Sequence, residues 1–169
     1  YVACPNRRIV YLTSTSNLRT ISINSIPDYL PRNIHIPYLL IENALDDKLL
    51  KKVTDFYKLQ KSQNKTISHK HATKDRLHVH PNKELEMELD HKFSRSILPE
   101  IKKIFYFDVT HRETYKICSY DAETSGKFHS HRDTPEPYQH RKYAMSLFLN
   151  DNYEGGEFSL PEYGLKIKP

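Results

Sequence analysis

The sequence of 169 residues contains two cysteines, no tryptophan and no long apolar run. Because Cys4 and Cys118 are too few for a disulfide framework, the class of small disulfide-stabilised secreted domains is excluded. This cysteine usage predicts a reducing, cytoplasmic or other intracellular setting. The apolar segment Ile34 to Ile41 contains His35 and Pro37 and is far shorter than the ~20 residues of a membrane helix. A protein held in a membrane by a helix is therefore not expected.

The chain also lacks an initiating methionine and the basic-then-apolar pattern of a secretory signal. It opens with short β-favouring runs separated by Ser, Thr and Asn, which favours one or two edge strands or an extended arm over residues 1–25. We expect residues 1–26 to be an N-terminal arm or the remnant of an upstream domain. Residues 27–169 are expected to form one domain, long enough to bury a core without disulfides.

Charge of one sign is not concentrated in any segment. The formal net charge is +5 and the sequence pI is about 9.1, but the Lys and Arg residues are scattered along the chain. This distribution favours an ordinary solvated surface over a nucleic-acid interface, and it leaves anionic small molecules as partners. The sequence does not determine the oligomeric state.

Two stretches have the apolar spacing of amphipathic helices. Asn43 is expected to cap the first helix, which runs to about Gln60, and the second begins at about Asn82 and is stopped or kinked near Pro99. The intervening residues 61–81 are polar and rich in Lys and His, and they predict a mobile surface loop. The apolar positions of the two stripes are Leu45, Leu49, Val53, Phe56 and Tyr57, then Leu85, Leu89, Phe93 and Ile97.

From Thr110 onward the apolar pattern changes to period two, which is typical of strands. Helices followed by antiparallel strands predict an α+β domain in which the helices brace one face of a sandwich or barrel. The expected strands are 114–120, 127–133, 141–150, 157–160 and the beginning of another at 165–168.

A histidine and an aspartate stand two residues apart in the expected strand 127–133. Side chains at i and i+2 of a strand leave the same face, so the His131 imidazole and the Asp133 carboxylate can reach one metal ion. An imidazole and a carboxylate are two of the three ligands in the facial triad that holds non-haem Fe(II) with open coordination positions. The alternative is a surface ion pair on a strand.

Several motifs follow one another in a specific order. They are the strand ending at Tyr120, His131-Arg132-Asp133-Thr134-Pro135, Ser146-Leu147-Phe148-Leu149-Asn150, and Gly155-Gly156-Glu157-Phe158 followed by Pro161. Over residues 27–169 their order and spacing resemble the prolyl 4-hydroxylase-like superfamily of Fe(II)/2-oxoglutarate-dependent dioxygenases.

The resemblance implies an α+β fold with a double-stranded β-helix, or jelly roll, that carries iron at one open end. It implies a hydroxylase that uses Fe(II), 2-oxoglutarate and O2, with ascorbate as an accompanying reductant. In such enzymes the cosubstrate is converted to succinate and CO2 while a substrate is hydroxylated. The substrate itself, a prolyl residue of a protein or a small molecule, is not identified by the sequence.

The resemblance also assigns roles to individual residues. His131 and Asp133 are iron ligands, and Tyr120 lines the 2-oxoglutarate pocket, where its hydroxyl can bond a carboxylate. Arg141 matches a basic position near the substrate entrance and is expected to bind substrate. Phe148 departs from the pattern, because several relatives have there a tyrosine that bonds the cosubstrate carboxylate.

Two further functional residues of that superfamily fall after the position of Pro169. They are the distal histidine ligand and the Lys or Arg that pairs with the far carboxylate of 2-oxoglutarate. We therefore expect this chain to be a C-terminally truncated dioxygenase. Catalysis would require a continuation of the chain, a second chain or a substitute ligand.

Two other interpretations stay open. His129 with His131, and Glu136, resemble part of a cupin-type metal site that does not use 2-oxoglutarate, although Glu123 stands where that motif requires glycine. Alternatively, the same fold without a complete iron site would be a non-catalytic binding module for an acidic partner. The histidines of the polar loop are expected to be solvated rather than metal-bound: His69, His71, His78 and His80.

Overall fold

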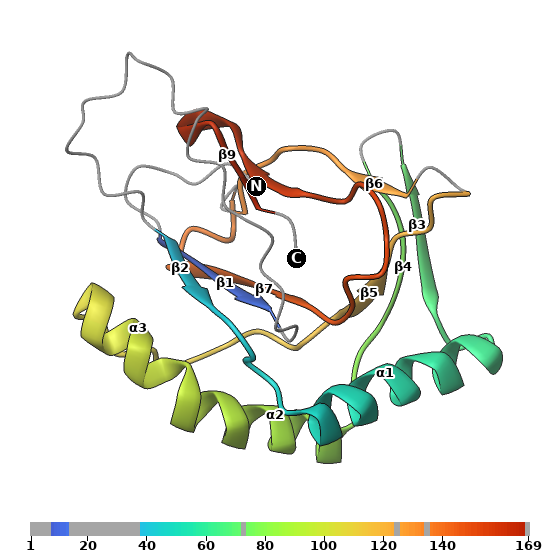
Figure 1. Cartoon of the computed structure of the whole chain (residues 1–169), viewed down its shortest axis with the longest axis horizontal. Coiled ribbons are helices and arrows are strands. Elements are labelled where there is room, and N and C mark those ends of the chain that lie inside the picture. The colour runs from blue at the N-terminus through green and yellow to red at the C-terminus, as the bar shows by residue number, and fades with distance from the viewer. Residues whose placement is uncertain (1–7, 14–37, 72–73, 124–125, 134–135, 168–169) are drawn as a thin grey trace. The chain divides into compact units, whose positions relative to one another are not determined.

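The computed structural model describes residues 8–13, 38–71, 74–123, 126–133 and 136–167, and these residues form a mixed α+β protein (Figure 1). The α+β class predicted from the sequence is confirmed. In chain order the elements are β1 Arg8–Thr13, β2 Tyr38–Ile41, α1 Asp47–Ser62, β3 Ile67–His71, β4 Lys74–Val79, α2 Lys83–Ser96, α3 Leu98–Phe105, β5 Ile117–Ser119, β6 Lys127–Phe128, β7 Tyr143–Phe148, β8 Phe158–Leu160, the 3-10 helix η2 Pro161–Tyr163, and β9 Leu165–Ile167.

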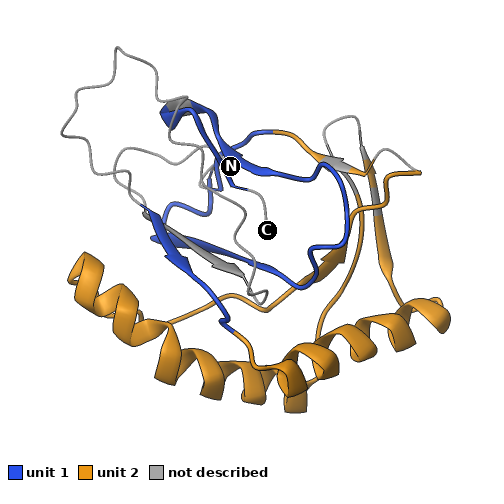
Figure 2. Cartoon of the chain, in the orientation of Figure 1, with its two compact units in different colours: residues 1–44, 130–169 blue, residues 45–129 orange. Residues whose placement is uncertain are grey.

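The chain divides into two compact units (Figure 2). Unit 1 consists of residues 1–44 and 130–169, and it contains β1, β2, β7, β8 and β9. Unit 2 consists of residues 45–129, and it contains α1 to α3 and β3 to β6.

Helix α1 begins later than the sequence pattern predicts. Its N-cap is Asp46, whose carboxylate accepts a 3.0 Å hydrogen bond from the backbone N–H of Leu49. Asn43 has a φ of 52°, a left-handed conformation that asparagine tolerates. The prediction that Asn43 caps this helix is wrong, because aspartate caps a helix equally well and Asp46 lies directly before the first helical turn. Leu49 and Val53 of the predicted stripe are buried.

Helix α2 is capped as predicted, since the Asn82 side chain accepts a 2.9 Å hydrogen bond from the backbone N–H of Leu85. After the turn residue Ile97, α3 begins at once with Pro99 in its first turn, where the missing N–H costs no helical hydrogen bond. Pro99 therefore marks the start of a new helix. The predicted apolar stripe of α2 is buried, at Leu85, Leu89 and Phe93.

Residues 61–81, predicted to be a mobile loop, contain an antiparallel hairpin of β3 and β4. Strand β4 also pairs with β5 and β6 along its other edge. The loop prediction is wrong because most residues of this hairpin are polar, and the apolar alternation is confined to Leu77 and Val79, which is too short a pattern to predict a strand. Side-chain bonds link α1 to its neighbours: Tyr57 donates to the Ser119 hydroxyl at 2.6 Å, and Lys52 pairs with Glu84 at 2.8 Å.

Strand β5 and strand β6 are shorter than the predicted strands 114–120 and 127–133. Pairing ends at Phe128, so residues 129–133 lie outside any strand. The expectation that His131 and Asp133 project from one strand face is therefore wrong. Strand β6 pairs with β4 at only two positions, Lys74 with Phe128 and Asp75 with Lys127, because residues 77–79 of β4 pair with β5.

In unit 1, β1 lies between β2 and β7, and both pairings are parallel. The predicted edge strand or extended arm is therefore wrong for Arg8–Thr13, which is a central strand. The remainder of residues 1–25 lies outside the described residues. Strand β7 belongs to the region expected to form antiparallel strands, but it pairs in parallel with β1, because pairing direction depends here on a partner at the other end of the chain.

Strands β8 and β9 form an antiparallel hairpin around η2, close to the bounds predicted for them. Gly164 ends η2 with a φ of 60°, a conformation that favours glycine. The hairpin supplies the hydrophobic core of unit 1. Buried in it are Phe158, Leu160, Tyr163, Leu165 and Ile167, with Tyr38, Leu40 and Phe148 packed against them.

The described residues form three separate sheets and show no closed barrel. None of the helices described here is both long enough and apolar enough to cross a bilayer.

We predict that Leu85→Ala destabilises the protein by about 3 kcal/mol, because it removes a side chain that is 1% exposed and leaves a cavity. Met87→Ala on the same helix is the matched control, since Met87 is 63% exposed, and it should cost less than about 0.5 kcal/mol. Urea unfolding of both variants measures the difference. Equal costs for the two would contradict the packing described for α2.

Candidate functional site

His131 and Asp133 lie close together in unit 1. The distance between His131 Nε2 and Asp133 Oδ1 is 3.2 Å, and the two side chains are 28% and 25% exposed. The sequence spacing therefore did bring the pair together, although a loop rather than a strand carries both residues. Partial burial reduces competition from water for both donor atoms, which favours either an ion pair or a shared metal ion.

The distance between the two atoms fits adjacent positions around one metal ion. Two ligands in cis positions of an octahedral ion, each about 2.1 Å from it, lie roughly 3 Å apart. Imidazole nitrogen and carboxylate oxygen are both donors that Fe(II) accepts. Within the described part of the chain, however, His, Cys, Asp and Glu form no group of three that could hold a metal. The pair accordingly fits two positions of such a site and does not complete it.

Arg141 contacts the loop that carries this pair. Its guanidinium donates a 2.9 Å hydrogen bond to the backbone carbonyl of Asp133, and it lies over the Tyr138 ring at 4.0 Å. Its backbone N–H donates to the Tyr138 carbonyl at 3.2 Å. These contacts link Arg141 to Asp133 and Tyr138, whereas the sequence assigned it to substrate binding. A positioning role for Arg141 is thus the one that its contacts support.

Tyr120 belongs to unit 2, at the residue after β5. Its hydroxyl accepts a 3.3 Å hydrogen bond from Arg76 Nη1, and the Arg76 guanidinium also lies over the Phe128 ring at 5.3 Å. Poor solvation of the hydroxyl raises the pKa of Tyr120, although the residue as a whole is 46% exposed. A neutral phenol that can donate a hydrogen bond is what a carboxylate ligand requires.

Phe148 ends β7 and packs against the hydrophobic core of unit 1. Its apolar side chain has a packing role there. His129 is exposed and belongs to unit 2, whereas His131 belongs to unit 1.

The prediction of a solvated loop is wrong for His78, which lies in β4, whereas His80 follows that strand and is exposed. His78 is 4% exposed, and its ring meets that of His80 edge-on, with 5.5 Å between centroids. His80 Nδ1 lies 2.9 Å from the Tyr115 carbonyl oxygen, so this nitrogen carries the proton and donates. The side chains of His69 and His71 lie outside the described residues.

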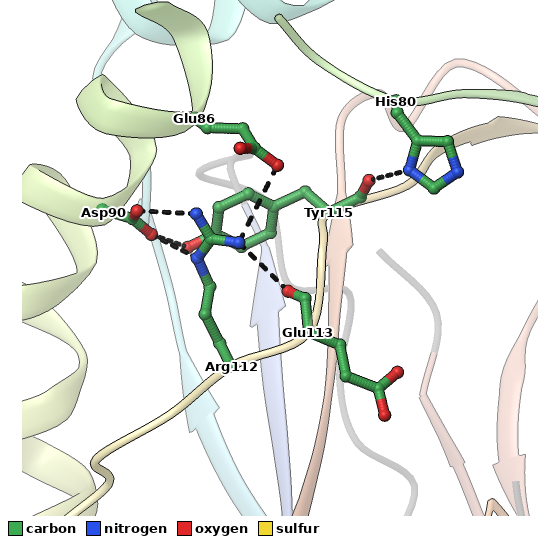
Figure 3. A network of polar contacts seen from close by, with 6 residues as sticks. All are labelled: His80, Glu86, Asp90, Arg112, Glu113 and Tyr115. Atoms are coloured by element: carbon green, nitrogen blue, oxygen red, sulfur yellow. Dashed lines mark hydrogen bonds and ion pairs between the residues drawn. The ribbon is translucent and has the colours of Figure 1, made fainter. Parts of the chain in front are cut away.

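A polar network in unit 2 was not anticipated from the sequence (Figure 3). The Arg112 guanidinium donates two hydrogen bonds to the Asp90 carboxylate, from Nε at 2.5 Å and from Nη2 at 2.6 Å. The Tyr115 hydroxyl donates to the same carboxylate at 2.7 Å, and the guanidinium lies 4.2 Å from the Tyr115 ring. Glu86 adds a longer ion pair of 3.8 Å to Arg112 Nη1. The network ties the irregular segment 106–116 to helix α2.

The network shifts the ionisation of its members. Hydrogen bonds from Arg112 lower the pKa of Asp90, and the bond from Tyr115 lowers it further, while burial acts in the opposite direction. Burial, followed by the hydrogen bond to Asp90, raises the pKa of Tyr115 far above its ordinary value. No local spacing links Arg112 to Asp90, which is 22 residues earlier, so sequence reasoning had no pattern from which to find this site.

Comparison of the chain with protein-family models, with curated proteins and with solved structures found no match.

We predict that Arg141→Met speeds backbone amide exchange in residues 136–142 by roughly 3- to 10-fold, because the hydrogen bond to the Asp133 carbonyl and the stacking on Tyr138 are lost. The control is Lys142→Met, which changes the exposed neighbouring side chain. Hydrogen exchange followed by mass spectrometry measures the amide exchange rates of both variants. An exchange rate unchanged from that of the parent chain would exclude the positioning role.

We also predict a pH-dependent cost of Asp90→Asn. Because the folded pKa of Asp90 is lowered, its contribution is complete above its ordinary value of 3.8 and disappears as the pH falls through the lowered folded value. The Asp90 side chain is 45% exposed, so the cost at pH 7 should be about 1 kcal/mol after screening. Urea unfolding should show that Asp90→Asn lowers the free energy of unfolding at pH 7 and that this difference is absent at about pH 2.

The control for that measurement is Asp151→Asn, which alters an exposed carboxylate of unit 1. A cost of Asp90→Asn that stays the same from pH 7 to pH 2 would mean that the substitution acts by some route other than the ion pair.

Proposed function

We propose that this chain belongs to an Fe(II)- and 2-oxoglutarate-dependent dioxygenase of the prolyl 4-hydroxylase-like superfamily, which hydroxylates a protein prolyl residue or a small molecule. The observation that carries the proposal is the 3.2 Å approach of His131 Nε2 to Asp133 Oδ1 in a half-buried loop. The order of the surrounding sequence motifs adds to it. The double-stranded β-helix is part of the same proposal, and so is an intracellular setting, which the two cysteines favour.

In this proposal His131 and Asp133 would hold iron in two adjacent positions. Bound iron and 2-oxoglutarate would supply the oxidative decarboxylation that yields succinate and CO2 with hydroxylation of the substrate. The third protein ligand comes from outside the described residues.

The chain's own residues prepare the pair for this task. For Nε2 of His131 to bind a metal, the imidazole must be neutral with its proton on Nδ1. Asp133 provides the carboxylate, and its backbone carbonyl accepts a hydrogen bond from Arg141. Such outer contacts orient metal ligands and commonly change metal affinity by 10- to 100-fold. Tyr138 completes the support by stacking beneath the Arg141 guanidinium.

We expect an anaerobic titration with Fe(II) and 2-oxoglutarate to produce the visible charge-transfer band of a chelated 2-oxo acid. The band should be lost in His131→Ala and in Asp133→Ala, because each removes a protein ligand of the proposed iron. His91→Ala, at an exposed position on α2, is the matched control and should keep the band.

The variant His129→Ala separates this proposal from the cupin-type alternative. A dioxygenase that uses His131 and Asp133 keeps the band without His129, whereas a His-x-His site loses its metal. Should the parent chain give no band at any iron concentration, the non-catalytic binding module would become the better description. Circular dichroism of each variant establishes that it is folded.

A further inference from the structure

The residues that connect α3 to β5 have no regular structure. Residues 107–114, here called the strap, contain no helix or strand, and all of them except Val109 are exposed. Segments with few buried side chains open at a lower free energy than the packed elements around them. The strap is therefore the part of unit 2 from which a separate opening motion is expected.

Both ends of the strap are held in place. Before it, Tyr106 ends α3, and its N–H donates to a carbonyl of the last helical turn at 2.8 Å. After it, the Tyr115 hydroxyl donates to Asp90 at 2.7 Å, and the Tyr115 carbonyl accepts a 2.9 Å hydrogen bond from His80 (Figure 3). The Tyr115 ring also meets the buried Phe93 ring edge-on, with 5.7 Å between centroids. These contacts allow the strap to move while α3 and β5 stay where they are.

Between these ends, Arg112 attaches the strap to α2. Its Nε and Nη2 bind both oxygens of Asp90, and the two side chains are 35% and 45% exposed. Another ion pair of the strap, between Asp108 and Lys102 at 2.9 Å, joins side chains that are 70% and 64% exposed. A bidentate pair that is partly shielded from water is stronger than a single contact between exposed groups. Of these two pairs, the one between Arg112 and Asp90 therefore holds the strap more strongly.

Release of this pair leaves no isolated charge in the interior. Asp90 still accepts the hydrogen bond from the Tyr115 hydroxyl, and the Arg112 guanidinium, on an exposed segment, becomes solvated by water. Burying an unpaired charge is what makes the loss of many ion pairs costly, and that cost does not arise here.

We propose that the strap opens as a unit when Arg112 leaves Asp90, while the rest of unit 2 stays folded. Arg112 also pairs with Glu86 at 3.8 Å, so its release frees two carboxylates of α2. The closed strap thus neutralises this part of α2, and the open strap leaves it acidic. The device goes beyond the proposed function, since it lies within unit 2 and requires neither iron nor the His131–Asp133 pair.

The test is native-state proteolysis of the whole chain with thermolysin, which cleaves before large apolar residues and requires an extended stretch of backbone. Phe107 and Val109 provide cleavage sites in the strap, and mass spectrometry identifies the fragments. The cleavage rate is measured over a range of urea concentrations below the unfolding transition. Because local opening exposes little surface, the rate should depend weakly on urea, whereas cleavage through global unfolding would rise steeply.

We expect Arg112→Met to speed cleavage of the strap roughly 5- to 30-fold, because the loss of two hydrogen bonds to a charged group shifts the opening equilibrium by about that factor. Arg95→Met removes an exposed arginine of α2 as the matched control and should be cleaved at the rate of the parent chain. Lys102→Met removes the exposed pair with Asp108 and should speed cleavage by a smaller factor.

A conservative variant keeps the test decisive if Arg112→Met unfolds. Arg112→Lys keeps the charge without the bidentate edge and should be cleaved at a rate between those of the parent chain and Arg112→Met. The inference would be overturned by equal cleavage rates in the parent chain, Arg112→Lys and Arg112→Met. Cleavage of the parent strap with the steep urea dependence of global unfolding would overturn it as well, since the strap would then not open separately.

Discussion

The bidentate ion pair between Arg112 and Asp90 is the interaction on which the arrangement of unit 2 depends. Residues 106–116 contain no helix or strand, so backbone hydrogen bonds of regular structure do not hold them. Arg112 and Tyr115 both donate hydrogen bonds to the Asp90 carboxylate on α2, and these bonds hold the segment in place. Strand β5 begins two residues after Tyr115, so the positions of β5 and of Tyr120 depend on how residues 106–116 are attached to α2.

The two arginine clusters of unit 2 have a tyrosine hydroxyl and an aromatic ring in common, and they differ in the presence of a carboxylate. Around Arg112 the carboxylate comes from the chain itself, and the result is a structural link. Around Arg76 the aromatic ring and phenol are present, yet the described residues provide no carboxylate. A planar donor edge that binds a carboxylate stabilises the fold, whereas a buried donor without an acceptor lowers its stability.

Much of the helical structure could be predicted from local sequence. The stripes of α1 and α2 and the Asn82 cap depend on residues three or four positions apart, so their physical cause lies within a short window. The β8–β9 hairpin was predictable for the same reason. The β3–β4 hairpin was missed because most of its residues are polar and only Leu77 and Val79 alternate. The central place of β1 was missed because one of its two partners, β7, lies at the other end of the chain.

For the candidate site, the sequence by itself determined that His131 and Asp133 would be near one another, since only Arg132 separates them in the chain. It also determined the α+β class, through the change from helical to alternating spacing. Only the tertiary structure decided that a loop carries this pair, that Arg141 supports it, and that Arg76 and Arg112 meet tyrosines of other segments. Those contacts join residues 8 to 44 positions apart, and their formation depends on the packing of whole elements, which no short stretch of sequence encodes.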